Sequence, residues 1–182
     1  MIPTIAPQTA VGRPKASTNL VTNGGFKTNT TGWSVDVSRV LASDDSITAP
    51  EGLYVGKTTT SGSANYACSG VTVGSLTSST VYTVQRWFYR TEAVAQLTFR
   101  VRNAANTGNL ASADIPLSTG WHYMTLTFTS NGTSHIVNVN CAPASVVVFY
   151  ADAFQLEAGP VATPYISTDG GTASRSALKW VA

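Results

Sequence analysis

Residues 97–103 read Leu-Thr-Phe-Arg-Val-Arg-Asn, and this short stretch decides the fold class. Its large apolar residues, Leu97, Phe99 and Val101, occupy every second position, and polar or charged residues stand between them. Successive side chains of a β-strand point to opposite faces, so this pattern places one face in a core and the other in water. The stretch therefore predicts a half-buried strand.

The same alternation recurs on both sides of this stretch, as in the Met124, Leu126 and Phe128 series. Turn signals such as Asn131-Gly132 separate the runs, and no window carries a helical stripe. Many short strands without helices predict an all-β, antiparallel jelly-roll sandwich. The predicted strands are 33–41, 53–59, 66–73, 81–90, 96–103, 122–129, 135–140 and 146–156. The predicted core contains Leu97, Phe99, Val101, Leu126, Phe128, Val137 and Val148.

The composition agrees with a folded, weakly charged domain. Hydrophobic residues make up 43% of the 182 positions, and charged residues only 11%, against roughly 25% in typical soluble proteins. The formal net charge of +2 is too small for a nucleic-acid footprint, so we expect no nucleic-acid partner. No apolar run approaches the ~20 residues of a membrane-spanning helix, and the first ten residues lack the basic start of a signal peptide. We therefore expect no membrane insertion.

The two cysteines, Cys68 and Cys141, both lie in strand-like runs. A disulfide between neighbouring strands and two buried thiols are both compatible with this placement, and we favour the two thiols. Neither cysteine has the spacing of a metal site, and no cofactor is expected.

The two ends of the chain differ from its middle. Residues 1–18 contain Pro3, Pro7 and Pro14, which block helical and central-strand structure, and we interpret them as an extended arm. Residues 19–167 form the predicted sandwich, and residues 168–182 a C-terminal tail. We expect both ends to dock on other subunits, with a homo-oligomer as the assembly. The apolar anchors for this contact are Ile2, Ile5, Val11, Leu178 and Trp180.

The strand 81–90 carries the best material for a binding surface. If Phe88 lies in the core, Trp87 and Tyr89 face outward, where sugar rings could stack on them. Polar pairs at the same spacing occur on other strands, and we group them with the two aromatics into one carbohydrate-binding face: Arg100 and Arg102, and Asn138 and Asn140. The alternative is that Trp87 and Tyr89 pack in the core or under the arm.

An enzymatic function finds little support in the sequence. His122 and His135 are the only histidines, and His122 shares a strand side with Met124, which is typical of a packing histidine. Asp44 and Asp45 are adjacent, so on a strand they would face opposite sides and could not act as a glycosidase pair. We expect no catalysis and no catalytic residues.

Two groups of motifs resemble carbohydrate-binding-module jelly rolls. The opening is Asn19-Leu-Val-Thr-Asn23-Gly24-Gly25-Phe26 followed by Trp33, and later come Val81-Tyr82-Thr83, Trp87, Trp121 and the run 149–157. The ending Gln155-Leu-Glu157 with Thr163-Pro164-Tyr165-Ile166 is similar to the version found in structural proteins of tailed bacteriophages. The resemblance spans about residues 19–170, and it implies the jelly-roll fold.

The resemblance also bears on a metal site. Carbohydrate-binding members commonly hold a structural calcium ion with an acid after Gly-Gly-Phe and an acid in the last strand. Here Lys27 occupies the first position and Asp152 the second. A cation opposes calcium binding, so we expect a Lys27–Asp152 ion pair in place of the metal; two exposed, unpaired charges are the alternative.

Three functions remain open at this point. The first is a structural protein of a tailed-phage virion, on the tail, baseplate or capsid surface, made in the host bacterial cytoplasm and contacting other virion proteins and host glycans. The second is a free-standing carbohydrate-binding module. The third is a glycoside-processing enzyme. The two terminal extensions favour the first.

Overall fold

The computed structural model describes residues 16–27, 29–34, 39–60, 67–93, 95–105, 107–141, 146–168 and 171–176. Within these residues the secondary structure consists of strands, and no helix long and apolar enough to cross a membrane is found among them. The strands are β1 Ser17–Asn19, β2 Trp33–Ser34, β3 Arg39–Asp44, β4 Val55–Thr60, β5 Ala67–Val73, β6 Val81–Arg90, β7 Leu97–Asn103, β8 Asn109–Ile115, β9 Gly120–Thr129, β10 His135–Cys141, β11 Val148–Ala158 and β12 Ala173–Arg175.

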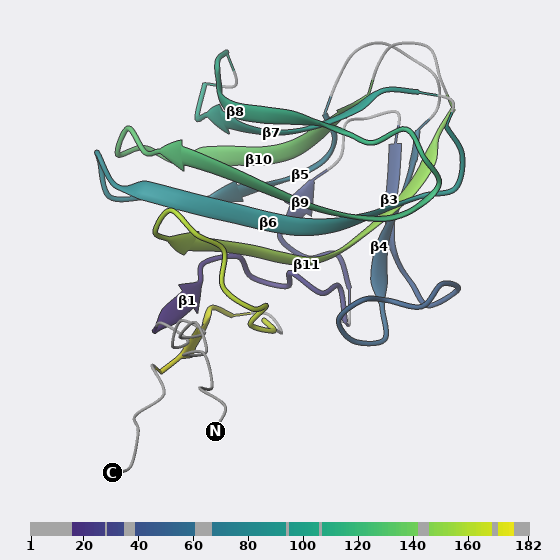
Figure 1. Cartoon of the computed structure of the whole chain (residues 1–182), viewed down its shortest axis with the longest axis horizontal. Helices are drawn as coiled ribbons and strands as arrows, with labels where there is room; N and C mark the ends of the chain where they lie inside the picture. The colour runs from purple at the N-terminus through teal and green to yellow at the C-terminus, as the bar shows by residue number, and fades with distance from the viewer. Residues whose placement is uncertain are drawn as a thin grey trace, which may run out of the picture.

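Ten of these strands form two antiparallel sheets stacked as layers (Figure 1). The β10 sheet has the order β2-β5-β10-β7-β8, and the β11 sheet has the order β3-β4-β11-β6-β9. Strands adjacent in space are often distant in sequence, as in a jelly roll. The predicted all-β jelly-roll sandwich is confirmed.

The core lies between the two sheets and follows the predicted alternation. Leu97, Phe99 and Val101 are each 0% exposed, and the polar residues between them are partly exposed. The Phe88 ring of β6 contacts the Phe99 ring of β7 edge-on, with centroids 5.1 Å apart, and so joins the two layers. Six of the seven predicted core residues are buried. Val148 is the exception, because the β11 strand turns its neighbours Val147 and Phe149 inward instead.

Two strand predictions differ from the structure. Residues 109–115 form β8, which was not predicted because the inward positions Ala111 and Ala113 give little apolar contrast. The predicted strand 33–41 corresponds to two strands, β2 and β3, in different sheets; residues 35–38 between them lie outside the described part.

The contacts of Asn19 and Gly24 explain why the opening motif contains an asparagine and a glycine at these positions. The buried Asn19 amide donates to the carbonyl oxygens of Phe154 and Ile166, at 3.1 and 2.9 Å. Its Oδ1 accepts from the backbone N–H of Val21 and of Leu156. A Cβ at Gly24 would lie 2.3 Å from the Phe154 carbonyl oxygen, so only glycine fits there. The motif therefore fastens the start of the domain to β11.

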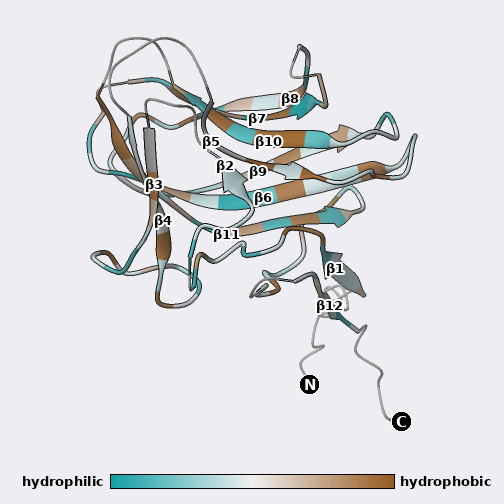
Figure 2. Ribbon diagram, turned by 180° about the vertical axis from the view of Figure 1, so that it is seen from behind, coloured by the Kyte–Doolittle hydropathy of each residue, from teal (hydrophilic) through white to brown (hydrophobic). Residues whose placement is uncertain are grey.

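The β1 and β12 strands pair with each other beside the two main sheets, as Figure 2 shows. The predicted domain boundaries at residues 18/19 and 167/168 lie within this packed region. Ser17 pairs with Arg175, and Thr168 is 2% exposed. The described ends of the domain therefore lie side by side.

The Cys141 sulfur is disulfide-bonded, and Cys68, on the neighbouring strand β5, is the only other cysteine in the sequence. The favoured interpretation of two buried thiols was wrong. Alternation and burial are the same for a buried thiol and for half of a disulfide, so the sequence pattern could not separate the two.

Candidate functional site

The outer face of the β11 sheet carries the two aromatic residues predicted for binding. Phe88 is 0% exposed in the core, and its neighbours Trp87 and Tyr89 accordingly face outward, each half-buried. The predicted outward orientation of these two side chains is therefore what the structure shows, and they do not pack in the core. Residues 1–15 of the arm lie outside the described residues, so the alternative of packing under the arm stays open.

Three further aromatic residues join them. In the β6–β9 register Trp87 lies opposite Tyr123 and Tyr89 opposite Trp121. The ring centroids of Trp87 and Tyr123 are 5.0 Å apart, and those of Tyr89 and Trp121 are 5.2 Å apart. Tyr150 of β11 extends the row from Tyr89 at 6.0 Å. We call these five residues the aromatic band.

Exposure changes along the aromatic band. Tyr123 is 46% exposed, whereas Tyr150 is only 6% exposed and lies under the Lys57 ammonium at 5.5 Å. Lys57 also forms an ion pair with Asp44, at 3.3 Å. Burial raises the Asp44 pKa, but hydrogen bonds from Ser46, and then the Lys57 pairing, outweigh burial and leave the pKa lowered. The accessible end of the band is thus the end at Trp87 and Tyr123.

A cavity of about 350 Å³ opens beside this accessible end, and we call it the Trp87 pocket. Its walls combine the aromatic band with the segment 159–168, which follows β11 and which we call the strap. The lining residues are Glu51, Gln85, Trp87, Tyr123, Ala153, Ala162, Thr163, Pro164 and Tyr165.

Buried hydrogen bonds hold the strap in place. Gln85 donates from Nε2 to the Thr163 carbonyl at 2.9 Å, and its Oε1 accepts from the Tyr123 hydroxyl at 2.5 Å. Gln155 donates to Glu157 at 2.8 Å and accepts from the Ile166 N–H at 2.7 Å. The polar residues of the Gln-Leu-Glu and Thr-Pro-Tyr-Ile ending therefore form the hydrogen bonds that hold one wall of the pocket in place.

Glu157 is the centre of this network. Its carboxylate accepts from the Thr163 N–H and hydroxyl, and also from Gln155 and the Ser17 hydroxyl. Burial raises its pKa, but these hydrogen bonds together outweigh burial and leave the pKa lowered. Burial, and then the Glu157 charge, raises the pKa of Tyr123.

Asp152 precedes the lining residue Ala153 and is held by backbone N–H groups. It is 0% exposed, and its two carboxylate oxygens accept from the backbone N–H of Glu51 at 2.9 Å and of Ala153 at 2.6 Å. Burial raises its pKa to about 7. The Arg86 charge acts on this carboxylate and, with the two backbone hydrogen bonds, opposes the larger effect of burial on its pKa. Lys27 is exposed at the surface, and the Lys27–Asp152 ion pair stays a prediction.

Arg86 is itself buried in the core. Its guanidinium lies 4.5 Å from the Trp33 ring centroid and within 5.6 Å of the Phe26, Phe88 and Phe154 rings. Burial lowers its pKa to about 9. The aromatic rings provide the cation–π contacts that partly offset the loss of hydration.

Calcium does not fit this arrangement. Both Asp152 oxygens already accept N–H groups, and the described residues contain no cluster of three potential metal ligands. Calcium requires six to eight oxygen ligands, so no metal is assigned here.

The remaining predicted binding residues lie on the opposite layer. Arg100 and Arg102 belong to β7, and Asn138 and Asn140 to β10, all on the outer face of the β10 sheet. Arg100 Nε donates to Asn138 Oδ1 at 2.7 Å. The structure thus brings these four residues together but separates them from Trp87 and Tyr89. Alternation assigns a side chain to a face of its own strand and cannot say which sheet the strand joins.

The residues considered for catalysis are placed apart. His122 is half-buried, with Nε2 2.7 Å from the Ser118 carbonyl oxygen. His135 is 0% exposed against Phe128, and burial lowers its pKa. Asp45 is exposed, and Asp44 pairs with Lys57. The predicted terminal anchors Ile2, Ile5, Val11, Leu178 and Trp180 lie outside the described residues.

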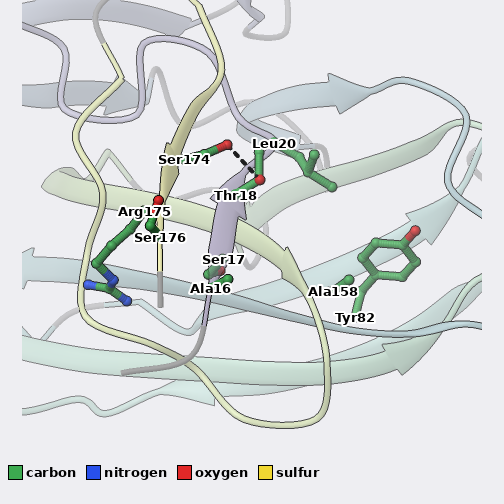
Figure 3. Close-up of a pocket in the computed structure, with 9 residues that line it drawn as sticks. All are labelled: Ala16, Ser17, Thr18, Leu20, Tyr82, Ala158, Ser174, Arg175 and Ser176. Atoms are coloured by element: carbon green, nitrogen blue, oxygen red, sulfur yellow. Dashed lines mark hydrogen bonds between the residues drawn. The ribbon is translucent and has the colours of Figure 1, made fainter. Parts of the chain in front are cut away.

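A second hollow, of about 480 Å³, lies between the β1–β12 pair and Tyr82 (Figure 3). Three of its hydroxyl groups are already engaged, because Thr18 bonds Ser174 at 2.7 Å and Ser17 bonds Glu157. Tyr82 is its one aromatic lining residue and is 5% exposed. It offers less for recognition than the Trp87 pocket.

Comparisons with known proteins identify relatives of the fold. Residues 18–143 match the family model of a carbohydrate binding domain. No curated protein matches the sequence. The fold is similar to the CBM22-1 xylan-binding domain of Paenibacillus barcinonensis Xyn10C, with a TM-score of 0.56 and 17% identity over 80% of this chain and 94% of that one.

Two other solved structures are also similar. One is the enzymatically active domain of tailspike protein 4 of bacteriophage CBA120, with a TM-score of 0.60 and 11% identity over 78% of this chain and 21% of that chain. The other is a cyclase from Fischerella sp. TAU, with a TM-score of 0.59 and 15% identity over 82% of this chain and 100% of that one. This chain thus spans about a fifth of the tailspike domain, and such identities establish the fold alone.

Proposed function

Because the chain belongs to the carbohydrate binding domain family, we propose that it is a non-catalytic module that binds a glycan on the aromatic band and in the Trp87 pocket. The observation that carries the proposal is that accessible aromatic rings lie directly beside a cavity whose walls combine apolar and polar residues. Binding sites generally combine apolar and aromatic walls with a few fixed polar groups.

The aromatic band supplies the stacking surface. The carbon-bound hydrogens of a sugar ring pack on aromatic faces, and tryptophan and tyrosine provide large contact areas at low cost in side-chain entropy. Mutual ring contacts on β6 and β9 hold Trp87 and Tyr123 in place before any ligand arrives. Such preorganisation lowers the free energy cost of binding.

The pocket supports binding better than hydrolysis. Glycoside hydrolases generally use two carboxyl groups about the scissile bond, and Glu51 is the one carboxylate that lines the Trp87 pocket. Asp152 is 0% exposed and hydrogen-bonded on both oxygens. Incubation of the protein with any oligosaccharide that it binds, followed by chromatography, should return the oligosaccharide unchanged. Release of shorter products would favour the enzyme instead.

Substitution of Trp87 tests the binding surface. We expect Trp87→Ala to weaken binding to a recognised oligosaccharide at least about tenfold in calorimetry, as loss of a central aromatic anchor does. Arg102→Ala is the control, because Arg102 is a partly exposed residue on the opposite sheet. Circular dichroism should show the same fold in both variants. Unchanged binding in Trp87→Ala, with loss in Arg102→Ala, would move the site to the β10 sheet.

A second candidate is that this module is carried on the surface of a tailed-phage virion, on the tail, baseplate or capsid, as a homo-oligomer. The ending that fastens the strap resembles phage structural proteins, and one similar structure is a phage tailspike domain. The paired β1 and β12 bring the described ends together, so residues 1–15 and 177–182 could reach one neighbour. Purified virions of the source phage should contain the protein by mass spectrometry, and a chain lacking residues 1–15 should fold but fail to incorporate. Normal incorporation would remove this role for the arm.

A further inference from the structure

The Trp87 pocket has an uneven charge. Glu51 is the single charged residue among those that line it, and no lysine, arginine or histidine does so. The volume of about 350 Å³ lies at the small end of the roughly 300–1,000 Å³ typical of small-molecule sites. The pocket is therefore suited to a small part of a glycan rather than to a long segment.

One other carboxylate adds to the negative potential near the pocket, because Glu157 is bonded to the lining residue Thr163. Asp152 lies next to the lining residue Ala153, and because burial raises its pKa to about 7 it carries only part of a negative charge at neutral pH. A cleft lined by one sign of charge focuses its field on the ligand.

Three described cations lie near the pocket without lining it. Arg175 donates to the carbonyl oxygen of the lining residue Pro164 at 3.3 Å. The Arg86 guanidinium lies among aromatic rings and its charge acts on Asp152, and Lys57 is paired with Asp44 at the Tyr150 end of the aromatic band. A ligand in the pocket thus meets the Glu51 carboxylate, and no positive side chain among the described residues belongs to the lining.

The Glu51 side chain itself is available. Its backbone N–H holds Asp152 and so fixes the loop, whereas its carboxylate makes no hydrogen bond or ion pair within the part of the chain that the structure describes. The residue is exposed. A carboxylate can accept hydrogen bonds from sugar hydroxyls or an ammonium group, and it repels another anion.

We infer that the Trp87 pocket selects neutral or amino sugars and that Glu51 is the residue that excludes acidic sugars such as uronates. This inference rests on the proposed glycan binding and adds the class of ligand. The aromatic band would contact sugar rings of either class, so the discrimination comes from the charge at Glu51.

The test compares matched oligosaccharides by calorimetry at low salt. The probes are cellohexaose, xylohexaose and a galactohexaose as neutral sugars, a chitosan hexamer as the amino sugar, and an oligogalacturonate hexamer as the acidic sugar. The wild-type chain should bind at least one of the first four and bind the uronate at least about tenfold more weakly. Glu51→Gln should narrow the ratio of neutral to uronate affinity at least about fivefold, because one like-charge contact is removed.

Glu92→Gln is the control, since it removes the same charge from an exposed residue outside the pocket lining and should change neither affinity. Wild-type binding to the uronate equal to or tighter than to every neutral and amino probe, or an unchanged preference in Glu51→Gln, would overturn the inference and leave glycan binding standing. Absence of binding to all five probes would contradict the proposed function and the inference together.

Discussion

Thr163 is bonded twice to Glu157: its N–H donates to Oε1 and its hydroxyl donates to Oε2, each at 2.7 Å. Glu157 is 1% exposed on β11, and Thr163 lines the Trp87 pocket from the strap. One side chain of the sheet therefore fixes a wall of the candidate binding site. Stability and ligand binding should be coupled at this contact.

Replacing Thr163 by valine tests that coupling. Thr163→Val keeps the shape of the side chain but removes the hydroxyl that donates to the buried Glu157 carboxylate. Unfolding free energy, measured in urea, should fall by about 1–3 kcal/mol. Thr125→Val, on the exposed side of β9, is the control and should change little. Equal stabilities for the two variants would show that the strap contact contributes nothing.

Gly24 provides a test of the opening motif. Gly24→Ala places a Cβ 2.3 Å from the Phe154 carbonyl oxygen, so the backbone must shift. We expect a loss of at least roughly 1–3 kcal/mol in unfolding free energy. Gly74→Ala is the matched control, because nothing lies within 4 Å of its added Cβ. The prediction fails if thermal melts of the two variants coincide.

Asp152 predicts a specific dependence of stability on pH. Burial raises its folded-state pKa from its ordinary value of 3.8 to about 7. The folded state then holds a proton that the unfolded state releases, so stability from this group is complete below about pH 4 and is lost as the pH rises to about 7. The melting temperature of wild type minus that of Asp152→Asn should therefore fall as the pH rises across this window.

The comparison of the two proteins isolates Asp152 from other titrating groups. The lowered His135 pKa acts in the opposite direction, since its stabilising contribution is lost as the pH falls, but it is present in both proteins. A constant difference in melting temperature from pH 4 to pH 8 would rule out the raised pKa.

The disulfide at Cys141 predicts sensitivity to reduction. The oxidised protein, unfolded without reductant, should contain no titratable thiol. Reduction should lower the unfolding free energy by roughly 2–4 kcal/mol, chiefly by relaxing a constraint on the unfolded chain. Two free thiols in protein prepared under oxidising conditions would be inconsistent with the structure.

Alternation along single strands was the strongest information in the sequence. It placed Leu97, Phe99 and Val101 in the core and turned Trp87 and Tyr89 outward, as the structure shows. These conclusions depend only on the period of two within one strand.

Relationships between strands could not be read in the same way. Trp121 and Tyr123 have the same spacing as Trp87 and Tyr89, but only the β6–β9 register shows that they meet. Arg100 and Asn138 also form a neighbouring pair, yet β7 and β10 lie in the other sheet. Strand pairing is set by long-range packing. For this reason the predicted carbohydrate-binding face combined residues that lie on the outer faces of two different sheets.

The position of a bound glycan tests the central claim most directly. A recognised oligosaccharide should be titrated into ¹⁵N-labelled full-length protein while backbone amide shifts are followed. The account predicts that the largest changes occur in the β6 and β9 residues around Trp87 and Tyr123 and in the strap near Thr163, with little change on β7 and β10. Changes centred on Arg100 and Asn138, with Trp87 and Tyr123 unaffected, would contradict it.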